Sequence, residues 1–192
     1  MTEKIFLIAV FAVAVVIMIV AMPKYVTDDT KKIRGYKKLK SDDINNIPDE
    51  ELENAVIEWL FSQIDAKGTT EVPLVRAMLP ECRYVYSTYI ITGEVCSGGF
   101  AQCFKHIDSY FFSNAVEGFI AMGAENLAVM LEKACEIAGR HIQENGRNKW
   151  SALEENEELS GLSREFVQSE EIATLSETLI KYIRENSECF GE

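Results

Sequence analysis

The stretch that decides the fold is Glu125 to Arg140, ENLAVMLEKACEIAGR. Its apolar residues recur three or four positions apart, a spacing that places them along one side of an α-helix. These residues are Leu127, Val129, Met130, Leu131, Ala134, Ile137 and Ala138. Glu132, Lys133 and Glu136 are charged residues at positions between them. The sequence therefore predicts an amphipathic helix, and its apolar side needs other helices to cover it.

Further helices are predicted on both sides of this stretch by the same periodicity and by residues typical of helix ends. The predicted elements are a helix from Pro48 to Gly68, a helical region from Val72 to Ile91, a short helix from Phe100 to His106, a helix from Ala115 to Met122 and a last helix from Ser169 to Asn186. Turns are expected at Gly93 and at Gly98-Gly99, and residues 147–168 have a mixed pattern. Residues Tyr84 to Ile91 also suit a β-strand, but no partner strand follows, so helix is preferred. Residues 47–192 are thus predicted to form an all-α helical bundle.

An apolar run near the start of the chain predicts a membrane-spanning segment. Ile5 to Met22 contains eighteen apolar residues without interruption, followed by Pro23. As a helix this run is about 27 Å long, close to the roughly 30 Å of the hydrocarbon core. A cleaved signal peptide is the alternative, but its apolar core is usually shorter and preceded by more basic residues. Residues 1–23 are therefore predicted to be a transmembrane anchor, with residues 5–22 in the bilayer.

The charges beside this run predict its orientation. Residues 1–40 hold eight Lys or Arg residues against three acidic residues, and seven of the basic residues follow the apolar run. Basic residues close to a span are retained in the cytoplasm. Residues 24–46 are therefore interpreted as a basic juxtamembrane linker, and the C-terminal domain is expected on the cytoplasmic side. Five cysteines without framework spacing also favour a reducing compartment.

The domain beyond the linker is strongly acidic. Residues 41–192 carry eleven basic and twenty-eight acidic residues, a net charge of -17. Such a domain repels nucleic acid and anionic lipid, so no direct nucleic-acid binding is expected. A basic protein surface is the partner that the charge suits, although acidity can also serve solubility alone. Candidate partner-binding residues are the clustered Glu154, Glu155, Glu157 and Glu158.

Residues 94–104, EVCSGGFAQCF, resemble the signature of the acidic DNA-mimic protein family, a helical family named after a member that mimics DNA. That signature reads approximately Glu-x-x-Asn-Gly-Gly-Phe-x-Gln-aromatic-aromatic. The matching residues are Glu94, Gly98, Gly99, Phe100, Gln102 and Phe104. Ser97 replaces the Asn and Cys103 replaces an aromatic residue. With weaker likeness around Gly123 and in the last helix, the resemblance covers roughly residues 50–190.

The matching residues also have a physical interpretation as a folding device. Two glycines permit a tight turn or a close helix approach. Phe100 and Phe104, four positions apart, share one side of a helix and can anchor the turn in the core. Glu94 and Gln102 are expected to bond the backbone groups that the turn sets free.

Catalytic and metal sites have little support in the sequence. Cys103 and His106 are spaced to face together on a helix, but no orienting carboxylate is required by the pattern. A zinc site from Cys96, Cys103 and His106 has neither paired cysteines nor a fourth ligand. Gly98-Gly99 lacks the Lys and hydroxyl of a phosphate loop. The sequence therefore predicts no enzyme, no cofactor and no metal.

The expected function is that of a membrane-anchored acidic protein-binding module. The resemblance implies that it mimics DNA, or otherwise covers a basic surface of a partner such as a DNA-binding protein. Three alternatives stay open at this point. They are an immunity-type inhibitor of a toxin, a structural membrane adaptor, and an enzyme dependent on Cys103 and His106.

Overall fold

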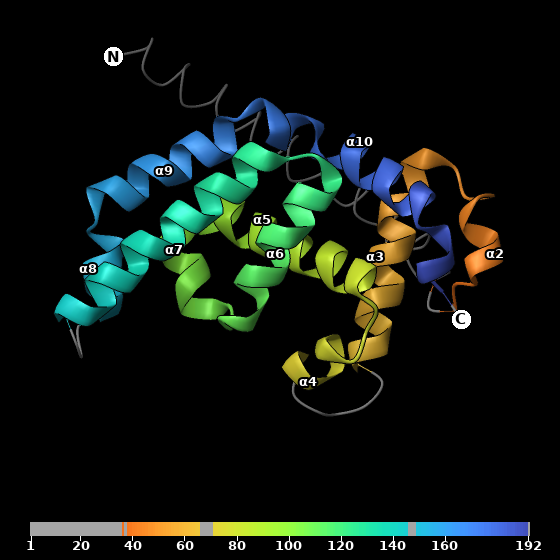
Figure 1. Ribbon diagram of the computed structural model, residues 1–192, viewed down its shortest axis with the longest axis horizontal. Helices are drawn as coiled ribbons and strands as arrows, with labels where there is room; N and C mark the ends of the chain where they lie inside the picture. The colour runs from red at the N-terminus through yellow and green to blue at the C-terminus, as the bar shows by residue number, and fades with distance from the viewer. Residues whose placement is uncertain (1–35, 37, 66–70, 146–148, 192) are drawn as a thin grey trace, which may run out of the picture. The chain divides into compact units, whose positions relative to one another are not determined.

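The structure is a computed structural model that describes Tyr36 and residues 38–65, 71–145 and 149–191. Within these residues every regular element is a helix, so the predicted all-α class is confirmed (Figure 1). The elements are α2 (Ser41–Ile44), α3 (Asp49–Asp65), α4 (Glu71–Arg76), α5 (Pro80–His106), α6 (Tyr110–Met122), α7 (Glu125–Asn145), α8 (Lys149–Glu154), α9 (Glu157–Gln168), α10 (Glu170–Glu185) and η2 (Ser187–Cys189).

The predicted transmembrane segment, residues 5–22, lies outside the described residues. Of the helices that are described, none has the length and apolar character needed to cross a bilayer. The compact unit formed by the helices runs from Lys38 to Glu192. It includes the last part of the predicted 24–46 linker, where Leu39 and Ile44 are buried.

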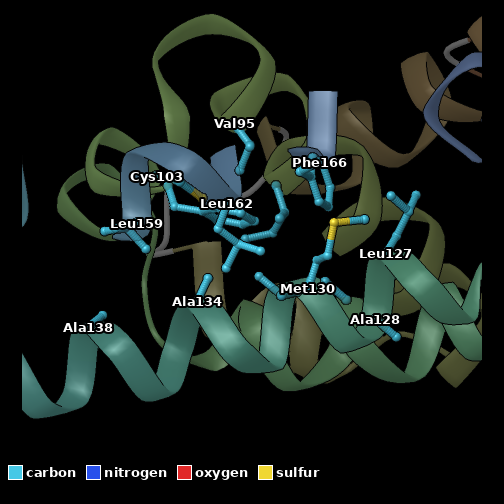
Figure 2. Packing of buried hydrophobic residues seen from close by; sticks show 14 of the residues in the cluster. Val95, Cys103, Leu127, Ala128, Met130, Ala134, Ala138, Leu159, Leu162 and Phe166 are labelled. Carbon is cyan, nitrogen blue, oxygen red and sulfur yellow. The ribbon is translucent and has the colours of Figure 1, made fainter. Parts of the chain in front are cut away.

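The core is built around α7, which packs against α5, α6, α8 and α9. Figure 2 shows side chains of α7, including Met130 and Ala134, facing Leu162 and Phe166 of α9. The apolar stripe predicted for this helix is buried as expected, except at Val129, which is 60% exposed. Position 129 lies about 200° around the helix from Leu127, so its side chain points away from the core. The prediction for Val129 is therefore wrong.

Helix α5 is longer than the sequence indicates. It begins at Pro80 and stays helical through Gly93, so the prediction of a turn at Gly93 is wrong. A glycine inside a helix is tolerated at a cost of about 1 kcal/mol relative to alanine, and the long apolar face of α5 outweighs it. The backbone leaves helical geometry only at Gly99, with φ 75° and ψ 177°. The turn predicted at Gly98-Gly99 therefore exists as a kink within one long helix.

Side-chain caps define the helices that follow. The mixed region 147–168 contains α8 and α9, and Asn156 caps α9 by accepting a hydrogen bond from Leu159 N. Ser169 caps α10 in the same way, accepting from Ile172 N, as its position in the sequence predicts. Gly123 ends α6 in a left-handed conformation, φ 79°.

The first and last segments of the unit are tied together. Arg184 of α10 donates to the carbonyl oxygens of Ile44 and Ile47 and to Asp49 Oδ1, the last at 2.6 Å. Helix α2 contacts η2. Gly191 has φ 112° and lies so close to the backbone of Ser41 that a Cβ would sit 2.4 Å from its nitrogen. The segment before α3 is therefore held in place by the C-terminal residues.

Candidate functional site

The kink at Gly99 lies where α5 meets α9. Its φ and ψ fall in a region that only glycine adopts without strain. A Cβ at this position would lie 3.0 Å from Ser163 Oγ. The kink frees the N–H of Phe100, which donates to Ser163 Oγ at 3.0 Å, and that hydroxyl donates to Leu159 O at 2.8 Å. A side chain from α9 therefore satisfies the broken helix.

This arrangement corrects the role expected for Glu94 and Gln102. These side chains bond each other, Gln102 Nε2 donating to Glu94 Oε2 at 3.1 Å. The same carboxylate oxygen lies 3.1 Å from His106 Nδ1. Gly98 makes room for this contact, because a Cβ there would overlap the Gln102 amide at 2.1 Å. Sequence reasoning missed Ser163, which is 63 positions from Phe100 and carries no motif that marks it.

The two aromatic residues of the motif anchor the kink. Phe100 is fully buried and packs edge-on against Phe166 of α9, with ring centroids 5.2 Å apart. Phe104 lies one turn further along the same side of α5, 6.2 Å from Phe100. Its ring also meets Phe112 of α6 at 4.8 Å. The C-terminal part of α5 is thus fixed on both sides by aromatic contacts.

Cys103 is buried beside the kink and is unsuited to act as a nucleophile. Burial, the nearby Glu94 carboxylate and the Cys135 thiol raise the pKa of Cys103 to about 12. A nucleophilic cysteine needs its pKa lowered instead. His106 does not serve it as a base through Nδ1, since that atom contacts Glu94. In the described part of the chain, no three His, Cys, Asp or Glu side chains come together as metal ligands.

The acidic segment, Glu154, Glu155, Glu157 and Glu158, surrounds the Asn156 cap between α8 and α9. All four side chains are exposed. Lys105 Nζ lies 3.4 Å from Glu154, and Arg140 Nη2 lies 3.4 Å from Glu158, both as exposed pairs. Such pairs contribute about 0–1 kcal/mol each. Unlike the motif residues, this segment therefore has few contacts that restrain its side chains.

The structure brings part of the motif and part of the acidic segment to one cleft of about 470 Å³. Gly98, Gly99 and Gln102 line one side of it, while Glu154 and Ser163 line the other. The remaining three glutamates do not line it. Of the predicted partner-binding residues, Glu154 of α8 is thus the one that shares this cleft with the motif.

These features define a class: an acidic, all-helical domain whose long central helix is kinked at a glycine and closed by a later helix. A model of the DMP19-like protein family matches residues 76–186, more than half of the chain. The chain therefore belongs to the DMP19-like protein family, in agreement with the resemblance to acidic DNA-mimic proteins. The match begins at Arg76, so α3 precedes it. No curated protein and no solved structure gives a significant match.

Proposed function

We propose that this protein is an acidic DNA mimic that binds the DNA-binding surface of a basic partner protein and so blocks it. The observation that carries the proposal is the net charge of -17 on residues 41–192 in a member of the DMP19-like family. Carboxylates held on rigid helices present negative charge as the phosphates of DNA do. A protein surface built to bind phosphates can also bind carboxylates.

The acidic segment is the part of the surface that we assign to first contact. Its exposed pairs with Lys105 and Arg140 are weak enough for a partner's basic residues to replace them. Opposed charges raise association rates, and salt reduces this effect over a Debye length of about 8 Å at physiological ionic strength. Association with the partner is therefore expected to be fast and dependent on salt.

We also propose that residues 5–22 anchor the protein in the membrane with residues 41–192 in the cytoplasm. The apolar run and the basic residues after it support this topology. Anchoring would hold the captured partner at the membrane, away from DNA. A reporter fused after Glu192 should be active only when it is of a kind that works in the cytoplasm. Activity of an exported reporter at the same position would contradict the topology.

The same proposal gives the protein a binding role and assigns no catalytic role to its residues. The motif residues Glu94, Gly98, Gly99, Phe100 and Gln102 are engaged in packing and in contacts with one another. Replacing Cys103 or His106 by alanine is accordingly expected to leave partner binding unchanged.

The test is capture of partners by the full chain, solubilised in neutral detergent, from an extract of the source cell. DNA-binding proteins should be retained, and duplex DNA should release them by competition. Retained proteins that DNA does not release would contradict mimicry and favour the immunity-type inhibitor or the adaptor.

A captured partner then allows the acidic segment to be tested by association kinetics at low and high salt. A variant with Glu154, Glu155, Glu157 and Glu158 changed to Gln should associate more slowly and show a flatter salt dependence. The matched control removes the same charge from exposed positions elsewhere, at Glu132, Glu136, Glu177 and Glu188. Equal slowing in both variants would assign binding to overall charge rather than to this segment. Association that does not depend on salt would overturn the electrostatic model.

A further inference from the structure

A second cavity, of about 610 Å³, lies between α3, α5 and α10 on another part of the domain. Its volume falls within the roughly 300–1,000 Å³ typical of ligand pockets. Ile172, Leu175 and Leu179 of α10 give it an apolar wall. Part of the lining, from α3 and α4, precedes the residues matched by the family model. The cavity is therefore not defined by the family match alone.

Three aromatic rings form another wall of this cavity. Phe61 of α3 packs edge-on against Tyr86, with ring centroids 5.2 Å apart, and against Tyr89 at 6.1 Å. Tyr89 is 42% exposed although it belongs to this cluster. The face of an aromatic ring attracts a cation within about 6 Å of its centroid. Tyr89, unlike the buried Tyr86, thus offers an accessible ring to a positively charged group.

Three carboxylates line the same cavity, and each is fixed through one oxygen. Ser176 donates to Glu53 Oε2, Tyr86 donates to Glu71 Oε1, and Gln102 donates to Glu94 Oε2. Within the described residues, no hydrogen bond reaches the second oxygen of any of the three. A carboxylate has about four acceptor sites, so each retains acceptor capacity. None of the described residues that line the cavity is Lys, Arg or His.

One neutral polar group adds to this set. Thr92 lines the cavity, and its hydroxyl is buried without a hydrogen-bond partner among the described residues. An unsatisfied buried hydroxyl destabilises a protein unless a partner reaches it. Because this oxygen is itself buried, the acceptors that the cavity offers to a ligand with several N–H donors are the carboxylates.

We propose that this cavity receives an arginine side chain of the partner, flanked by apolar residues of the same segment. A guanidinium is planar, stacks on aromatic rings and donates five N–H groups in a fixed fork, which suits a cavity lined by the partly exposed Tyr89 and by three carboxylates. The apolar wall on α10 accommodates the flanking residues. The proposal rests on the proposed function for the existence of a basic partner. It adds that recognition includes a shaped pocket as well as distributed charge.

The experiment is a calorimetric titration of the full chain, in neutral detergent, with a short peptide. The peptide is blocked at both ends and carries arginine between two leucines. Two matched peptides replace the arginine by citrulline, which keeps the shape without the charge, or by lysine. The arginine peptide should bind at least about tenfold more tightly than the citrulline peptide, and more tightly than the lysine peptide.

Two variants of equal charge locate the binding. Glu53→Gln keeps a group that can accept from Ser176 and should weaken binding of the arginine peptide about tenfold. Glu165→Gln, on an exposed position of α9, should change it less than about twofold. Tyr89→Leu removes one ring at a partly exposed position and should also weaken binding, which provides a second readout if Glu53→Gln does not fold.

The outcomes separate this proposal from the proposed function. Equal weakening by Glu53→Gln and Glu165→Gln would place the peptide on the general acidic surface, which overturns the pocket but leaves mimicry intact. Arginine and citrulline peptides of equal affinity would also overturn it. Self-association of the chain that Tyr89→Leu abolishes would make a second copy the occupant instead. Mimicry itself stands or falls with release of the captured partner by DNA.

Discussion

The Gly99 kink and Glu154 of the acidic segment line the same cleft, yet the kink and the segment are built in opposite ways. At the kink, backbone conformation, the Ser163 hydroxyl and the Phe100 ring all depend on one another. In the acidic segment, four exposed carboxylates make two exposed ion pairs, and neither pair fixes the backbone. A distinctive motif can therefore serve the fold, while the binding surface that we propose lies in a segment without one. Substitution at the kink should change stability, and substitution in the acidic segment should change binding.

The largest effect is expected at Phe100. Phe100→Ala removes a fully buried ring and leaves a cavity beside Phe166, which should lower the free energy of unfolding by about 3–5 kcal/mol. Ile120→Ala, on an exposed position of α6, should change it by about 0.5 kcal/mol or less. Urea unfolding followed by circular dichroism measures both. Similarly small losses of unfolding free energy in the two variants would contradict the assignment of Phe100 to the core at the kink.

Two glycines of α5 should respond in opposite directions to alanine. Gly99→Ala places a Cβ in a strained conformation next to Ser163 and should cost about 1–3 kcal/mol. Gly93→Ala lies in regular helix with open space around the new methyl group, and should stabilise by about 0.5–1 kcal/mol. Thermal unfolding of both variants tests whether the fold requires glycine at position 99 and not at position 93. A loss at Gly93 as large as at Gly99 would argue against this assignment.

The hydroxyl that closes the kink can be removed alone. Ser163→Ala leaves the N–H of Phe100 without its acceptor, which should destabilise the fold by about 1–3 kcal/mol. Ser160→Ala, an exposed serine one turn earlier in α9, should have an effect below about 0.5 kcal/mol. Hydrogen exchange at the Phe100 amide gives a second measurement. Unchanged protection of that amide in Ser163→Ala would show that the bond is unimportant.

The burial of the Cys103 thiol beside the kink should make the stability of the fold depend on pH. In the unfolded chain the Cys103 thiol ionises near its ordinary pKa of 9.0, whereas in the fold its pKa is about 12. Above pH 9 the unfolded state therefore binds fewer protons than the folded state. The contribution of this thiol to the free energy of unfolding is fully present below pH 9 and is lost as the pH rises toward 12. The slope is about 1.4 kcal/mol per pH unit for one such thiol. Cys103→Ala should flatten the decline between pH 9 and 10.5 relative to the wild type.

The smallest effect on stability is expected in the acidic segment. Changing Glu154, Glu155, Glu157 and Glu158 to Gln should alter the free energy of unfolding by less than about 1 kcal/mol, because exposed ion pairs contribute little. The same urea unfolding experiment measures it, alongside the association kinetics of this variant. A loss comparable to that of Phe100→Ala would show that the segment also supports the fold.

Local signals in the sequence predict much of the fold. The apolar periodicity of α7, the Ser169 cap of α10 and the Gly123 end of α6 involve residues within a few positions of one another. Gly93 misleads because a glycine has the same appearance in a turn and in a helix whose other contacts are strong. A glycine in a turn and a glycine in a helix look the same in the sequence, because the difference lies in how the surrounding segment packs.

The candidate site depends on contacts that the sequence does not encode locally. The motif marks the position of the kink, but its acceptor Ser163 comes from a helix 63 positions later. The cavity between α3, α5 and α10 combines Glu53, Glu71 and Glu94 from three different helices. No spacing along the chain relates these residues, because the path between helices decides which of them become neighbours.

The clamp that Arg184 and Gly191 form on the segment before α3 has a consequence for how the protein is made. Ile44 is synthesised 146 residues before Phe190. In the finished fold, helix α2, which contains Ile44, contacts η2, which directly precedes Phe190. At about 5–20 residues per second, the apolar Leu39 and Ile44 wait roughly 7–30 seconds for these partners. During synthesis the start of the domain is therefore its last part to be completed, and it is where chaperones have the longest opportunity to bind.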